Sequence, residues 1–333
     1  MLGFIIAAIV IIAVIIGINA PKWFNPNRIY EKYPETPKDL GLRKASKLLL
    51  TVDRLEASFD ADFTARLKYR VMQTHPKMKD AEFMWRLFEL KRYLMLTAVL
   101  KQVPMFSTKV DDVWHEMLMF TREYSTICDH VAGQFIHHAP HTETVSMPHE
   151  RAWFDWVYHQ VFTGTPPSRH MYRGFFQNPL DPRLLQDFRN KTVSELIEKY
   201  FNSQAVTRYP DVAKGVQHLI ETLQNQIKRA DQEMRETSVK EYVNHMADRV
   251  RRRQWEDDLP LMLATSSVYL SLYAQDDYAE HMMLLDRAKQ ADSSSASNCG
   301  GYVSGNSSHD SCDSSDGSSD SGSSCSSCGG GGD

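Results

Sequence analysis

The chain has 333 residues, with 38 Lys and Arg against 42 Asp and Glu and a formal net charge of -4. Hydrophobic residues make up 42% of it and charged residues 24%. This composition excludes a wholly disordered chain and a collagen-like repeat. The slightly negative charge gives no reason to expect a nucleic-acid partner.

The N-terminal residues are strongly apolar. Residues 2–20 carry no charge and consist mostly of Ile, Val, Ala and Leu. Because a helix of about 20 apolar residues crosses a bilayer, we expect residues 1–21 to be a transmembrane anchor in contact with lipid, followed by a juxtamembrane linker over residues 22–36. A cleaved signal peptide is the alternative, since Ile18-Asn19-Ala20 resembles a cleavage site, although no basic residue precedes the apolar run.

Basic residues follow the apolar run and none precedes it. Lys22, Arg28 and Lys32 come directly after it. Positive charge favours the cytoplasmic side of a membrane. The sequence therefore predicts a single-pass membrane protein with its N-terminus outside and its body in the cytoplasm.

The C-terminal residues 291–333 are dominated by Ser, Gly and Asp and contain no Lys or Arg. Such a segment has little to bury, so we expect a disordered tail. Cys325 and Cys328 form a CxxC pair there, which could chelate a soft metal or close a disulfide. A solvated tail with incidental thiols, or a docking segment, is the competing interpretation.

The body, residues 37–290, has a helical period and no convincing strand alternation, which predicts an all-α, multi-helix domain. Residues 163–182 are rich in Gly, Pro and aromatic residues and should be irregular but packed. The region 210–254 is long and charged and could fold as a helical hairpin. We expect a motif core over residues 79–165 and long helices over residues 182–289. The expected helices span residues 38–59, 60–74, 79–102, 108–131, 148–162, 182–202, 210–254 and 259–289.

Eight of the 13 histidines lie between His115 and His170. Asp111 and His115 are one helical turn apart, so their side chains can meet. The helical wheel places both nearly opposite the main apolar stripe, at a possible second, inner interface. Cys128 lies near the middle of the stripe, which predicts a buried and inert thiol.

This stretch resembles the glycine-rich domain-containing protein family, in its short bacterial form and its longer plant relatives. The resemblance covers about residues 92–141 and is accompanied by the Ser/Gly/Cys-rich tail. It implies no activity, because the family is largely uncharacterised. Met117 stands where plant-type motifs often carry a second His, so no role of that His can be transferred. The matching positions are Asp111, Trp114, His115, Thr121, Tyr124, Cys128, Gly133, His138 and Pro140.

Two interpretations of the histidine cluster remain open. Asp111, His115, His138 and His141 could hold zinc, iron or manganese, which imidazole and carboxylate ligands suit. Pro140 argues against a helix that would bring His137 and His141 together. The structural interpretation has Asp111 accepting from His115, with Trp114 and Tyr124 in the core.

The sequence as a whole favours a membrane-anchored helical interaction or scaffold protein, of bacterial type and with a protein partner. A metal-dependent enzyme or metal sensor centred on His115 is the alternative. No P-loop, GxGxxG or GxSxG motif is present to suggest another chemistry.

Overall fold

The computed structural model describes residues 28–137, 147–252 and 259–288, and this part of the chain is all-helical. Two isolated β-bridges join Leu42 to Phe162 and Leu100 to Phe201. None of the helices in the described ranges is long and apolar enough to cross a membrane. The expected anchor, residues 1–21, and the expected tail, residues 291–333, lie outside the described residues.

Fifteen α-helices and two 3-10 helices follow one another along the described chain. The first ones are α2 (Arg28–Lys32), η1 (Lys38–Gly41), η2 (Lys44–Ser46), α3 (Leu49–Ala57), α4 (Ala61–Thr74), α5 (Asp80–Val99), α6 (Thr108–Leu118), α7 (Thr121–Ala132) and α8 (Pro148–Val161). The others are α9 (Pro166–Met171), α10 (Pro182–Asn190), α11 (Val193–Tyr200), α12 (Ser203–Arg208), α13 (Pro210–Glu236), α14 (Val239–Arg251), α15 (Leu259–Tyr273) and α16 (Tyr278–Ala288).

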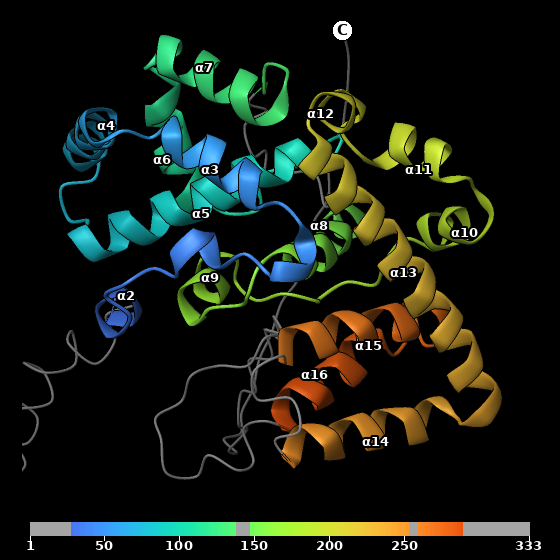
Figure 1. Ribbon diagram of the computed structural model, residues 1–333. Coiled ribbons are helices and arrows are strands. Elements are labelled where there is room, and N and C mark those ends of the chain that lie inside the picture. The colour runs from blue at the N-terminus through green and yellow to red at the C-terminus, as the bar shows by residue number, and fades with distance from the viewer. Residues whose placement is uncertain (1–27, 138–146, 253–258, 289–333) are drawn as a thin grey trace, which may run out of the picture.

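Helix α5 is the central element of the N-terminal half, with α2, α3, α6, α7, α9, α12 and α13 packed around it (Figure 1). It is buried on nearly every side, so it lacks the polar stripe of a surface helix. Helix α13 runs from α12 to the C-terminal helices α14–α16. It packs on α5 and α12 and also on α15 (Figure 1). The core is therefore continuous from α3 to α16.

Local signals in the sequence explain many helix ends. The side chain of Asp60 accepts a hydrogen bond from the Phe63 backbone at the start of α4, and Pro begins α8, α10 and α13. Thr192 and Ser238 form capping boxes at the starts of α11 and α14.

Four expected helices are shorter or more broken than their apolar periodicity predicted. The range 38–59 begins with two 3-10 turns, and the α-helix starts only at Leu49. The range 108–131 divides between α6 and α7, 182–202 divides into α10 and α11, and 259–289 divides into α15 and α16. The cap at Thr192 explains the break between α10 and α11. Apolar residues continue from α6 through Met119 and Phe120 into α7, so periodicity alone did not reveal that break.

The region 210–254 does not fold as the expected hairpin of two helices packed on each other. Helices α13 and α14 diverge after Thr237, and α13 packs on α15 while α14 packs on α16 (Figure 1). The expected irregular segment 163–182 is packed as predicted, with Phe175 and Phe176 buried, although it contains the short helix α9.

Candidate functional site

The candidate site is built on α6, whose start is fixed by Ser107. The Ser107 hydroxyl accepts from the Val110 backbone N–H at 3.4 Å and donates to the Met171 carbonyl at 3.0 Å. This contact ties the start of α6 to the end of α9. The first turns of α6 consequently present Lys109, Asp111 and Asp112 in fixed directions.

Asp111 and His115 meet, as their spacing predicts. The Nδ1 of His115 lies 2.9 Å from the Asp111 carbonyl oxygen and 3.5 Å from its carboxylate Oδ2. The Asp111 side chain is nearly buried, whereas 51% of the His115 side chain is exposed. The expected inner interface for His115 is therefore wrong. That expectation assumed one continuous helix over residues 108–131, whereas the chain turns at Met119 and Phe120 and His115 on α6 faces solvent.

The other helical motif residues form the interior of the same unit. The Trp114 ring packs on Tyr93 at 4.8 Å between centroids. The Tyr124 hydroxyl donates to the Ile136 carbonyl. These contacts hold the segment after α7 against the first turn of α7.

Cys128 is buried beside this contact. Burial raises the pKa of the Cys128 thiol, against hydrogen bonds with Ile136 and Tyr124 that lower it. A thiol with a raised pKa is a poor nucleophile and a poor metal ligand at neutral pH. The structure thus places Cys128 where the apolar stripe predicted it.

Thr121 and Gly133 mark the two ends of α7. Thr121 is its first residue and is exposed. Gly133 follows the last turn with φ +68, a left-handed conformation that glycine adopts without a Cβ clash. The remaining motif residues, His138 and Pro140, and the candidate ligand His141 lie outside the described residues, as do Cys325 and Cys328.

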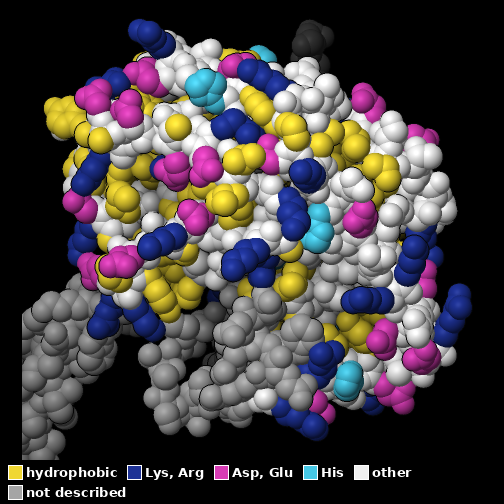
Figure 2. Space-filling view, in the orientation of Figure 1, with side chains coloured by type: hydrophobic (Ala, Val, Ile, Leu, Met, Phe, Trp, Pro, Cys, Tyr) yellow, Lys and Arg dark blue, Asp and Glu magenta, His cyan; other side chains and the backbone are white. Residues whose placement is uncertain are grey.

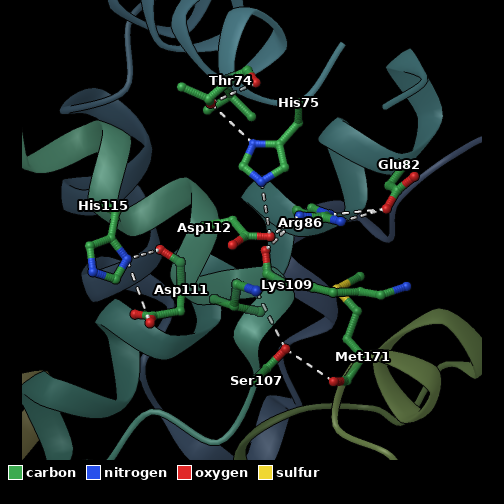
Figure 3. A network of polar contacts seen from close by, with 12 residues as sticks. Thr74, His75, Glu82, Arg86, Ser107, Lys109, Asp111, Asp112, His115 and Met171 are labelled. Atoms are coloured by element: carbon green, nitrogen blue, oxygen red, sulfur yellow. Dashed lines mark hydrogen bonds and ion pairs between the residues drawn. The ribbon is translucent and has the colours of Figure 1, made fainter. Parts of the chain in front are cut away.

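Next to Asp111 lies a second acid–histidine contact that the sequence analysis missed (Figure 3). Arg86 donates from Nη1 to Asp112 Oδ2 at 2.6 Å and from Nη2 to Glu82 Oε1 at 2.7 Å. His75 Nε2 approaches the same Asp112 oxygen at 3.5 Å. In Figure 3, His75 points toward Asp112, while His115 turns back toward Asp111. The Glu82–Arg86 spacing of four residues was the only sequence signal for this network.

Lys109 also contacts this network, because its backbone carbonyl accepts from Arg86 at 3.4 Å. Its amine is 3.2 Å from the Tyr30 hydroxyl and 3.1 Å from His170 Nε2. Burial is the main cause that lowers the pKa of Lys109, and burial followed by the charge of Lys109 lowers the pKa of His170. The pair joins α6 to α2 and α9.

No group of three or more His, Cys, Asp or Glu side chains is arranged to hold a metal ion within the described ranges. Of the four candidate ligands, the structure brings Asp111 and His115 together. The Asp112 carboxylate beside them is engaged by the Arg86 guanidinium. A guanidinium at a carboxylate competes with a cation for the same oxygens.

The chain matches a family model described as UCP032817-like over residues 53–154. The match covers less than half of the chain and includes α4 to α7 and both acid–histidine contacts. Comparisons with curated proteins and with solved structures gave no match. The resemblance to glycine-rich domain-containing proteins stays a prediction, because the matched family carries a different description.

Proposed function

We propose that this protein is a membrane-anchored helical binding module. Residues 2–20 would hold it in the bilayer, and the helical body would present a rigid surface to a protein partner at the membrane. The proposal keeps the cytoplasmic placement expected from the basic residues after the anchor. It assigns no reaction to the body and no nucleic-acid partner.

The main support for this proposal is that the motif side chains are used to pack the interior of the body. Trp114, Tyr124 and Cys128 are buried, and the Tyr124 hydroxyl donates to the Ile136 carbonyl in the segment after α7. Their polar atoms serve internal packing, and the raised pKa of Cys128 disfavours its use as a nucleophile. A motif used in this way builds a stable scaffold whose outer side chains are available for recognition.

The anchor is tested by alkaline carbonate extraction of membranes that contain the full chain. We expect the wild-type chain to stay in the pellet. A chain carrying Ile9→Asp and Ile12→Asp should move to the supernatant, because a charge at the centre of a transmembrane helix costs about 2.5–3.5 kcal/mol. Ile9→Leu with Ile12→Leu is the matched control. Release of the wild-type chain would disprove the anchor.

A metal site around His115 remains the second candidate, and one observation favours it. The Nδ1–H of His115 points at the Asp111 carbonyl, which assigns the lone pair to Nε2. Metal-binding histidines are commonly oriented by such a second contact. Elemental analysis of the untagged full chain, beside His115→Ala and His138→Ala, tests this candidate. A folded wild-type chain that binds no stoichiometric metal in solutions of Zn²⁺, Fe²⁺ or Mn²⁺ would exclude it.

A further inference from the structure

Two neighbouring leucines are exposed at the start of α3. Leu49 is 51% and Leu50 is 60% exposed, although the next two residues, Thr51 and Val52, are buried. Lys44 and Lys47 precede them and are also exposed. We call these four residues, Lys44, Lys47, Leu49 and Leu50, the KL surface.

The fold fixes the position of the KL surface. The Arg43 side chain donates to the carbonyls of His159 at 2.8 Å and Phe162 at 3.2 Å, at the end of α8. Leu48 is fully buried against Gly215 of α13, where an added Cβ would lie 2.8 Å from the Leu48 side chain. The segment is thus held on both sides, and Leu49 and Leu50 face outward because Leu48 faces inward.

The charges around the leucines are mainly positive. Neither Lys44 nor Lys47 forms an ion pair with a described residue, and Lys214, next to Gly215 on α13, is exposed as well. Asp53 and Glu56 follow along α3, and Glu56 is paired with Lys91 at 2.5 Å. In Figure 1, α3 lies at the front of the molecule, and on this face hydrophobic side chains lie among Lys and Arg as well as Asp and Glu (Figure 2).

This combination fits a lipid surface better than a protein. A specific protein interface buries about 800 Å² on each partner, and two leucines supply only a fraction of that area. Exposed apolar side chains with unpaired lysines suit the boundary between headgroups and acyl chains, and each lysine near anionic lipid contributes about 1 kcal/mol. Such a surface binds lipid only weakly, but weak binding is sufficient to orient the body when another segment already holds the chain at the membrane.

The connection between the expected anchor and α2 is short, so the helical body must lie close to the membrane. Only seven residues separate Ala20, the end of the apolar run, from Arg28, the start of α2. Even fully extended, this connection spans at most about 28 Å. The chain between the anchor and the KL surface exposes charges of both signs, namely Arg28, Lys32 and Lys38 together with Glu31, Glu35 and Asp39.

We propose that the KL surface rests on the anionic lipid headgroups beside the chain's own anchor, with Leu49 and Leu50 in the headgroup region and Lys44 and Lys47 against the lipid phosphates. This inference rests on the proposed membrane anchoring. It adds an orientation, since it states which face of the helical body is turned toward the bilayer. A protein partner would then have to bind another face.

Lysine footprinting of the full chain in lipid nanodiscs tests the proposal. The discs contain either phosphatidylcholine alone or phosphatidylcholine with 30% phosphatidylserine, a composition chosen as roughly that of an anionic leaflet. A water-soluble acylating reagent labels the lysines, and mass spectrometry gives the rate at each. We expect labelling of Lys44 and Lys47 to fall at least about threefold in the anionic discs. Lys228 and Lys240, exposed on α13 and α14, are internal controls and should not change.

Two variants separate the leucines from general charge effects. Leu49→Ser with Leu50→Ser should restore labelling of Lys44 and Lys47, whereas Val193→Ser with Leu284→Ser, at exposed positions on α11 and α16, should leave the protection intact. Both pairs are exposed, so the helical circular dichroism should stay unchanged.

The outcomes are distinguishable. A chain that enters the discs but shows equal labelling of Lys44 and Lys47 in both lipids would overturn the lipid contact and leave the anchor standing. Protection that appears only when membrane proteins are added would assign the KL surface to a protein and also overturn the proposal. A chain that fails to enter either disc would overturn the proposed anchoring together with this inference.

Discussion

Buried ionisable side chains join the helices of the body. The Glu89 carboxylate accepts from the Ser168 hydroxyl at 2.6 Å and from the Tyr158 hydroxyl at 2.8 Å. Arg92 donates to Tyr158 at 2.5 Å and to the Leu40 carbonyl at 2.8 Å. Glu89 and Arg92 are fully buried, so a single network connects α5, α8, α9 and η1. Burial raises the pKa of Glu89, against the attraction of Arg92.

Removal of one member of this network should be costly. Arg92→Leu leaves the Glu89 carboxylate buried without its countercharge, and we expect a loss of about 3–5 kcal/mol in the free energy of unfolding. Glu82, Arg86 and the rest of the α6 contacts are not altered by this change. Arg251→Leu, which removes an exposed pair with Asp248 within α14, is the matched control and should change stability little. Urea denaturation of the full chain measures both.

His159 predicts an acid-sensitive stability. Burial lowers the pKa of His159 to about 3 from 6.5, helped by Arg43, Arg92 and Arg151. The unfolded chain therefore binds a proton at this imidazole below pH 6.5 that the folded chain does not bind until about pH 3. Its contribution to stability is complete above pH 6.5 and falls as the pH drops toward 3.

Nearby Asp155 acts in the opposite direction. Burial raises the pKa of Asp155 to about 6, so the folded chain retains this proton more readily between pH 3.8 and 6. This contribution rises as the pH falls through that range. The His159→Leu chain has no imidazole at this position, so it should not lose the stability that the wild-type chain loses there as the pH falls. The slope of the free energy of unfolding against pH should change by up to about 1.4 kcal/mol per pH unit. Denaturation midpoints from pH 7 to 4 measure it, and parallel curves for wild type and variant would contradict it.

For single residues, the sequence predicted the burial of apolar side chains better than the burial of charged ones. The wheel placed Cys128 and Tyr124 inside, and both are buried. The burial of Glu89 and Arg92 follows from no pattern in the sequence, because charged residues are rarely buried unless paired, and the partners Tyr158 and Ser168 are more than 60 residues away from Glu89. No local sequence pattern indicates which distant residues will pair with a buried charge.

At the scale of elements, the all-α class and most helix positions follow from periodicity and caps, but some breaks do not. The turn between α6 and α7 contains neither Gly nor Pro. It is stabilised by Phe120, which packs on Phe63 of α4 at 5.4 Å and under Arg66. The 3-10 turns before α3 are similarly stabilised by distant partners, including His159 and Arg92. Tertiary contacts thus decided these ends and the exposure of His115.

Gly215 shows how closely two elements can approach. A Cβ at this position would lie 2.8 Å from the Ser46 carbonyl oxygen and from Leu48. Gly215→Ala should lower stability by about 1–3 kcal/mol through overpacking, even though Ala is the better helix former. Gln217→Ala, on the exposed side of α13, is the control and should be neutral or slightly stabilising. A Gly215→Ala protein as stable as wild type would show that η2 can move away from α13.

At the scale of the whole molecule, the range matched by the family model is not a separate body. The Asn202 amide donates to the carbonyls of Thr97 at 2.9 Å and Ala132 at 3.0 Å. Arg54 donates to Asp211 at 3.2 Å. Residues 53–154 are therefore completed by side chains that lie beyond the end of the matched range.

A chain that ends after residue 162 should consequently fail to form the native core. We expect it to lose cooperative thermal unfolding, while the chain ending after residue 290 retains it. Calorimetry with near-ultraviolet circular dichroism checks this, because the buried Trp114 and Trp156 report on fixed packing. A sharp transition in the shorter chain would show that the N-terminal half folds alone.

The hydrogen bond between Trp156 Nε1 and Gln226 Oε1, 2.9 Å long, also sets an order in time. During synthesis α8 leaves the ribosome well before α13 is complete. At about 5–20 residues per second, the 70 residues from Trp156 to Gln226 take about 4–14 s. For that interval the apolar side of α8 has neither α13 nor α15 to cover it. A nascent chain of this design depends on its surroundings, whether a chaperone or the nearby membrane, to keep that surface from aggregating until the later helices arrive.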